Sequence, residues 1–254
     1  MKKISTNQII TILITLLTIT VNVLANALPL NGQETGEISD RFAIYFVPAG
    51  YVFAIWGLIY LGLIGYTVYQ ALPAQRQNAL LNKIAPAYWI GNLANTVWIF
   101  LWHYNIFPVT LIAMLILLAS LLYIYVQIMQ AGVLNRTQKW LVRLPFSLYL
   151  GWISVATIAN FSQVLYYLNW NGFGVSGPAW AAIMTAVAAV IGLIMAWCNL
   201  DVAYVLVLVW AFVGIANQHT DTALVANSAL AAAGVLAVAL IAAPILKPRI
   251  VKDR

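Results

Sequence analysis

Tryptophan, tyrosine and asparagine side chains recur at helical spacing in the apolar stretches of this 254-residue sequence. Two sets of residues each follow steps of three and four positions and so share one face of a helix: Asn95, Trp98 and Trp102; and Tyr149, Trp152, Ala156 and Asn160. A buried indole N–H needs an acceptor nearby, and amide side chains supply acceptors. Such residues could recognise a flat, mostly apolar ligand with a few polar edges.

A third stretch adds Trp56 with Tyr45, Tyr60 and Tyr66, and Asn92 adds an amide one turn before Asn95. Three helices that present such residues to one another can line a ligand pocket. The same residues can instead pack helix against helix, with the amides bonded across the interfaces. The residue pattern alone leaves both interpretations open.

The sequence lacks the residues needed for proton transport, disulfide formation or metal binding. The first six apolar stretches contain no Asp, Glu, Lys or His near their centres, so a proton relay or an ion-coupled pump lacks its usual carriers. One cysteine, Cys198, forbids an internal disulfide, and it forms no metal-binding spacing with the two histidines. We therefore expect no catalytic residue set and no metal site.

The composition indicates what surrounds these residues. The chain is 64% hydrophobic and 7% charged, whereas an average soluble domain is roughly 45–50% apolar and about 25% charged. So few charges cannot cover a globule of this size in water, which disfavours a soluble enzyme, a disordered chain and a nucleic-acid-binding module. The solvent must be lipid.

Helices that span a bilayer core of about 30 Å need roughly 20 apolar residues each. Eight stretches qualify and predict an all-α, polytopic membrane bundle: Asn7–Leu28, Tyr45–Leu72, Ile84–Phe107, Val109–Gln130, Trp140–Leu168, Pro178–Trp197, Val202–Ala216 and Thr222–Leu246. Asn199 or Asp201 is expected to cap the seventh helix.

The basic residues orient the predicted spans. With both termini in the cytoplasm, eleven of the twelve Lys and Arg residues lie inside and only Arg41 lies outside. We therefore expect an integral protein of a bacterial inner (plasma) membrane with both termini cytoplasmic. A competing interpretation is that residues 1–27 are a cleaved signal peptide, since Lys2 and Lys3, an apolar stretch and Ala25-Asn26-Ala27 resemble one.

Three motifs resemble the tryptophan-rich sensory protein or translocator protein family. Leu148-Tyr149-Leu150-Gly151-Trp152, followed by Ala156 and Asn160, resembles the fifth-helix motif Pro-Tyr-x-x-Trp-x-x-x-Ala-x-x-x-Asn. Asn95-x-x-Trp98 with Trp102 is similar to the third-helix motif. The stretch from Pro48 through Tyr51 and Trp56 to Tyr60 resembles the second-helix motif.

The chain departs from these motifs at several positions. Leu148 and Ala49 replace family prolines, and one residue is missing between Tyr51 and Trp56, which turns a helix by about 100°. The resemblance covers roughly Asn7 to Asn169, which is the whole five-helix family fold. We therefore predict a family-like core at residues 1–170 and an additional three-helix transmembrane module at residues 171–254.

The resemblance implies a receptor or sensor that binds a tetrapyrrole, such as porphyrin or haem, or a sterol. It also implies membrane lipid as surroundings, no covalent cofactor, no nucleic acid, and a homodimer as a possible state. The residues implied to bind the ligand are Tyr51, Trp56, Tyr60, Asn92, Asn95, Trp98, Trp102, Tyr149, Trp152, Ala156 and Asn160. Light- or oxygen-dependent porphyrin breakdown at Trp56 and Trp152 is implied for some bacterial members and stays open here.

The three additional helices support a different class of function. A transporter, or a transporter subunit for a small hydrophobic substrate, could use helices beyond those that a sensor needs, although the missing mid-membrane charges count against it. Our expectation is instead that these helices form a packing and partner-binding module outside the ligand site, because the last one is rich in small residues that favour close contact.

Overall fold

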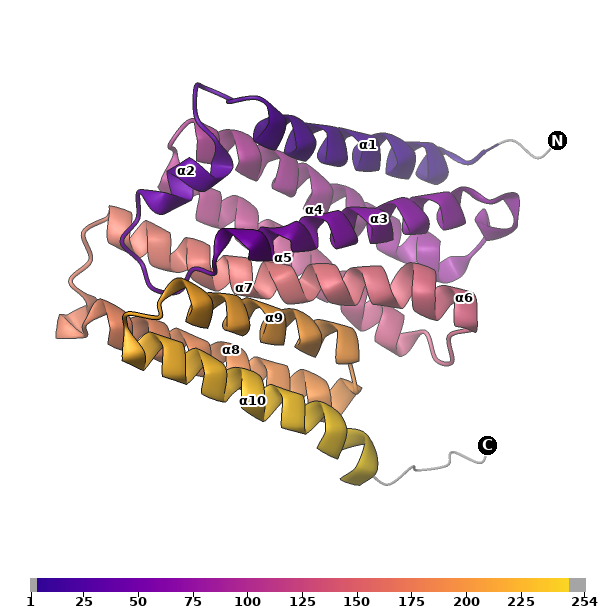
Figure 1. The fold of residues 1–254 in the computed structure, drawn as a ribbon. Helices are drawn as coiled ribbons and strands as arrows, with labels where there is room; N and C mark the ends of the chain where they lie inside the picture. Colours follow the sequence, from indigo (N-terminus) through magenta and orange to yellow (C-terminus); the bar gives the residue numbers. More distant parts are fainter. Residues whose placement is uncertain (1–3, 247–254) are drawn as a thin grey trace. The chain divides into compact units, whose positions relative to one another are not determined.

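The computed structural model describes residues 4–246, which are built from helices joined by short loops (Figure 1). The long helices are α1 (Thr6–Ala27), α3 (Ile55–Ala71), α4 (Ala79–His103), α5 (Phe107–Gln130), α7 (Leu144–Tyr167), α8 (Gly177–Asn199), α9 (Val202–Gln218) and α10 (Ala223–Leu246). Shorter elements are α2 (Thr35–Asp40), the 3-10 turns η1 (Gly50–Ala54), η2 (Pro73–Gln75) and η4 (Gly172–Gly174), α6 (Arg136–Gln138), and the π-helical turn η3 (Lys139–Arg143).

The predicted polytopic helical bundle is confirmed. Each of the eight predicted spans contains one long helix, and six helical segments of the described chain are long and apolar enough to cross a membrane. The other two long helices are α9, which has 17 residues, and α4, which carries several asparagines and a lysine.

The chain divides into two compact units. The first consists of Met1–Ala43 and Phe53–Trp170, and the second of Ile44–Val52 and Asn171–Arg254. In the first unit, α4 packs against α1 and α5, and α7 packs against α3 and α5 (Figure 1). Rings of Tyr66, Tyr88 and Phe146 meet in its core, with centroids 4.9 to 5.9 Å apart.

The buried face of α1 is polar. Five side chains spaced by three and four residues form this face, which we call the polar seam: Gln8, Thr11, Thr15, Thr18 and Asn22. The opposite face exposes leucines and isoleucines such as Leu13 and Leu16. Lipid is as apolar as leucine, so a helix in a membrane gains from burying the groups that can bond to its neighbours.

Hydrogen bonds join the polar seam to α3 and α4 along the length of α1. Gln8 Nε2 donates to the Gln70 carbonyl at 2.7 Å. Thr15 Oγ1 lies 2.9 Å from Thr67 Oγ1 and 2.7 Å from the Tyr88 hydroxyl. The helix is thus attached to its neighbours by side-chain polar contacts rather than by apolar packing.

The second unit packs small residues closely. The helix α10 packs against α8 and α9, and its buried positions are mostly alanines (Figure 1). At Gly192 of α8 a Cβ atom would lie 2.9 Å from a methyl group of Leu236, so the glycine permits close approach. Asp201 accepts a hydrogen bond from the Tyr204 N–H at 3.1 Å, which confirms the predicted cap of α9.

Two predicted boundaries were wrong. The second span was predicted from Tyr45, but residues 44–49 form no helix: the 3-10 turn η1 begins at Gly50 and α3 at Ile55. The Ala49 N–H donates to the Gly214 carbonyl of α9 instead. The third span begins five residues early, at Ala79, because the Asn78 side chain accepts the N–H groups of Leu80 and Leu81 as an N-cap.

The predicted orientation rests partly on residues outside the described part of the chain: Lys2, Lys3, Lys247, Arg249, Lys252 and Arg254. The cytoplasmic placement of both termini and the bacterial inner membrane therefore stay predictions.

Candidate ligand-binding site

Four of the predicted ligand-binding residues meet in the first unit and form what we call the Trp56 group: Trp56, Tyr60, Tyr149 and Trp152. The Trp56 ring stacks on Tyr60, with centroids 5.5 Å apart and an interplanar angle of 24°. Its centroid lies 5.9 Å from that of Tyr149 and 6.2 Å from that of Trp152, both edge-on. Trp56 and Tyr60 are half-buried, so this side of the group can be approached.

The other side of the Trp56 group contains two buried donors without acceptors. Tyr149 is 1% exposed and Trp152 is 3% exposed. The Tyr149 hydroxyl and Trp152 Nε1 have no hydrogen-bond partner among the described residues. The Asn95 side chain lies near the Tyr149 hydroxyl, but the two groups do not have the geometry of a hydrogen bond. A buried polar group that lacks a partner in a membrane protein is costly and is therefore a candidate contact for a ligand.

A second set, which we call the Trp98 group, consists of Trp98, Trp102 and Asn160. The two indoles stack with centroids 5.1 Å apart and planes 16° apart. Trp98 Nε1 donates to Asn160 Oδ1 at 3.2 Å, and Asn160 Nδ2 lies 2.9 Å from the hydroxyl of Thr110 on α5. Trp102 Nε1 donates to the Thr35 carbonyl at 3.2 Å. Every polar side-chain atom of this group has a partner, which is the behaviour expected of helix packing.

The Asn95 side chain and the Asn92 backbone carbonyl bond to α1. Asn22 Nδ2 donates to Asn95 Oδ1 at 2.7 Å, and Thr18 Oγ1 donates to the Asn92 carbonyl at 3.2 Å. Asn92 Nδ2 donates to the Tyr88 carbonyl, whereas Asn92 Oδ1 is buried without a partner among the described residues. The Asn95 side chain therefore joins α4 to α1, whereas the Asn92 side chain bonds only within α4.

The remaining two predicted residues lie apart from these groups. Ala156 is half-buried on α7, one turn beyond Trp152. Tyr51 is 46% exposed and belongs to the second unit, where its hydroxyl accepts a hydrogen bond from Asn217 Nδ2 at 2.8 Å. Tyr51 thus belongs to a different unit from the Trp56 group, although Tyr51 and Trp56 are five residues apart in the sequence.

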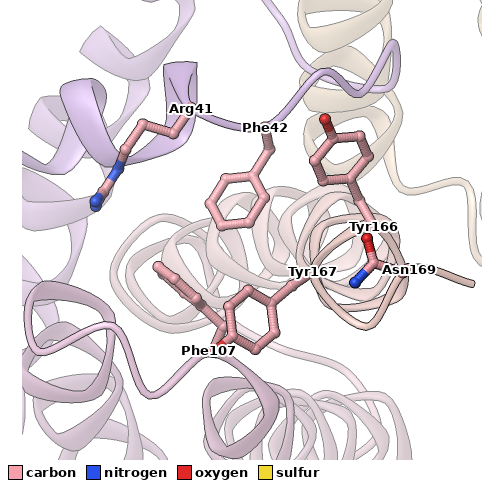
Figure 2. A pocket seen from close by; sticks show the side chains of 6 residues that line it. All are labelled: Arg41, Phe42, Phe107, Tyr166, Tyr167 and Asn169. Atoms are coloured by element: carbon pink, nitrogen blue, oxygen red, sulfur yellow. The ribbon is translucent and has the colours of Figure 1, made fainter.

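A pocket of about 270 Å³ opens elsewhere in the first unit (Figure 2). The residues that line it are Arg41, Phe42, Phe107, Tyr166, Tyr167 and Asn169. None of them is a predicted ligand-binding residue. The rings of Phe42 and Phe107 meet edge-on with centroids 4.9 Å apart, and each ring also contacts that of Trp102. Figure 2 shows the Arg41 guanidinium turned away from the rings, and it donates to Asn105 Oδ1 at 2.8 Å.

Sequence reasoning missed several residues that position the site. Tyr88 and the polar seam residues Thr15 and Asn22 hold α4 in place beside α1. The signal was present as threonines and asparagines at three- and four-residue steps within the first apolar stretch. Phe53, whose ring lies 5.5 Å from Trp152 at 85°, could not be distinguished from other apolar residues of its stretch.

Comparisons with known proteins support the resemblance of the motifs. Searches of curated proteins and of solved structures found no match. A family model described as TSPO-like protein matches residues 8–242. The match extends beyond Asn169, where the resemblance inferred from the motifs ends, and includes α8, α9 and most of α10. The division into a core at residues 1–170 and a separate module at residues 171–254 stays a prediction. This helical membrane protein belongs to the TSPO-like protein family.

Proposed function

We propose that this protein is a membrane receptor that binds a flat, mostly apolar ligand, such as a tetrapyrrole or a sterol, at the Trp56 group. The observation that carries the proposal is the pair of buried donors, the Tyr149 hydroxyl and Trp152 Nε1, which lie one helical turn apart on α7 without acceptors. A ligand with acceptor atoms on its edge would satisfy both groups.

The surroundings of the donors restrict the chemistry of the ligand. Neither α3 nor α7 contains Asp, Glu, Lys, Arg or His. A charged group of the ligand would find no counterion on α3 or α7, and its burial would cost about 2.5 kcal/mol or more. The buried part of the ligand is therefore neutral, with ring faces that stack on Trp56 and acceptors such as carbonyl oxygens or ring nitrogens. Carboxylates of a porphyrin would have to remain at the membrane surface.

Conservative variants of the two donors test the proposal. Purified protein is titrated with a porphyrin, and binding is followed by quenching of tryptophan fluorescence. Trp152→Phe and Tyr149→Phe each keep a ring and remove one donor, so each should weaken binding by about 1–3 kcal/mol, which is roughly 5- to 150-fold in Kd.

Trp98→Phe is the matched control. It removes an indole N–H from the Trp98 group, where Asn160 already accepts it, so the porphyrin Kd should stay within about twofold of that of the unmodified chain. Equal affinities in the unmodified chain, Trp152→Phe and Tyr149→Phe would refute the site. An absorption band of porphyrin or haem in the purified protein would support the tetrapyrrole class directly.

A further inference from the structure

Residues 44–52, which we call the strap, belong to the second unit and are held by α9. The Ala49 N–H donates to the Gly214 carbonyl at 3.1 Å. Trp210 Nε1 donates to the Val52 carbonyl at 3.0 Å, and Asn217 bonds to the Tyr51 hydroxyl. Positions 210, 214 and 217 share one face of the helix because they follow four- and three-residue steps.

Gly214 is required for this attachment. A Cβ atom at position 214 would overlap the Val52 side chain and would lie 3.1 Å from Cβ of Pro48. The strap therefore rests directly on the backbone of α9, and any larger residue at position 214 must displace it.

His219, just after the end of α9, supplies a further contact with the strap. Its ring lies 5.4 Å from that of Tyr45, and the Val47 carbonyl lies close enough to the imidazole to influence its charge. Nε2 is buried without a partner among the described residues, so a proton on this nitrogen would have no acceptor. Tyr45 of the strap also covers Gly177 at the start of α8, where a Cβ atom would lie 2.9 Å from its ring.

We propose that His219 makes the attachment of the strap depend on pH: the neutral imidazole holds the strap, and the imidazolium releases it. Protonation would place a second N–H in a buried position that offers no acceptor, and the strap would have to move to hydrate it. This inference does not depend on the proposed ligand function, because every contact it uses lies within the second unit.

The charged and titratable groups around His219 set the direction of the effect. Burial lowers the pKa of His219 below its ordinary 6.5, while the Val47 carbonyl and the carboxylate of Asp221 oppose this shift. Tyr45 is the titratable group that faces it from the strap. Because the native pKa lies below that of the unfolded chain, the attachment is fully stabilising above pH 6.5 and is lost as the pH falls through the lower native value.

The test uses Trp210 as a reporter in the full-length protein. Protein labelled with 5-fluorotryptophan in detergent micelles is followed by fluorine NMR between pH 7.5 and pH 5, with the Trp210 resonance assigned by Trp210→Phe. The Trp210 resonance should move in one transition with a midpoint below pH 6.5, because its N–H bonds to Val52 of the strap. Gly214→Ala should give a displaced Trp210 resonance already at pH 7.5.

Three variants decide the outcome. His219→Gln should abolish the transition, whereas His103→Gln, which removes the only other histidine of the sequence, should retain it. Asp221→Asn should lower the midpoint, because it removes the charge that favours the imidazolium. The proposal is overturned by a Trp210 resonance that does not respond to pH, by a transition that survives in His219→Gln, or, if that variant does not fold, by an unchanged midpoint in Asp221→Asn.

Discussion

At the scale of single residues, the partners of each polar atom separate structural residues from candidate binding residues. Trp98 and Asn160 bond to each other, whereas Trp152 Nε1 and the Tyr149 hydroxyl bond to nothing in the described chain. All four lie on predicted faces, and spacing alone could not divide them. Spacing specifies the face of a helix, but which neighbouring helix supplies an acceptor depends on how the helices pack.

Tyr149→Phe should therefore leave the ligand-free protein as stable as before, or stabilise it by up to about 1 kcal/mol, because it removes a buried hydroxyl without a partner. Asn160→Ala should destabilise by about 1–3 kcal/mol, since it leaves Trp98 Nε1 and Thr110 without their bonds. Thermal unfolding in detergent without ligand measures both. A clear loss of stability in Tyr149→Phe would mean that its hydroxyl has a partner after all.

At the scale of helices, the sequence predicted all eight long helices, since continuous apolar runs of sufficient length are a strong signal. It failed at the start of the second span, where Tyr45 to Ala49 are as apolar as a helix but pack against α9 instead. Hydropathy cannot distinguish an apolar helix from an apolar loop that is buried by a distant part of the chain.

The polar seam gives a prediction about helix attachment. Asn22→Ala and Asn95→Ala should each destabilise the protein, and the double variant should lose less than the sum, with a coupling energy of about 0.6–1.7 kcal/mol. Unfolding of the four proteins of this cycle in detergent provides the coupling. Leu16→Ala, on the exposed face of α1, is the control and should show no coupling with Asn95→Ala. A coupling near zero between Asn22 and Asn95 would mean that their contact does not hold the helix.

At the scale of the whole molecule, the two units are not successive in sequence, because the strap places residues 44–52 in the second unit. The predicted division at residue 170 treated the C-terminal helices as separate from everything before them. The residue types of the strap do not reveal that it belongs to the second unit. Only its contacts with α9, a distant part of the chain, show this. The family match over residues 8–242 includes parts of both units.

Cleavage of the loop between α7 and α8 tests this connection. A specific protease site inserted near Phe173, which is 87% exposed, allows the chain to be cut after folding. The two fragments should remain associated in mild detergent, because the first fragment carries the strap that α9 holds. Gly214→Leu should reduce the fraction that copurifies with a tagged C-terminal fragment. If the two fragments separate completely even when Gly214 is kept, the contacts between the strap and α9 do not hold the fragments together.

The polar face of α1 also determines which changes this helix can accept. In a soluble protein, replacing a buried threonine by valine is often mild, and replacing a surface leucine by threonine is milder still. Here the order should reverse, because Thr15 and Thr18 bond to neighbouring helices while Leu13 and Leu16 contact lipid. A saturation scan of α1, scored by the yield of folded protein, should tolerate any large apolar residue at positions 13 and 16. At positions 8, 11, 15, 18 and 22 it should retain only side chains that can donate or accept a hydrogen bond.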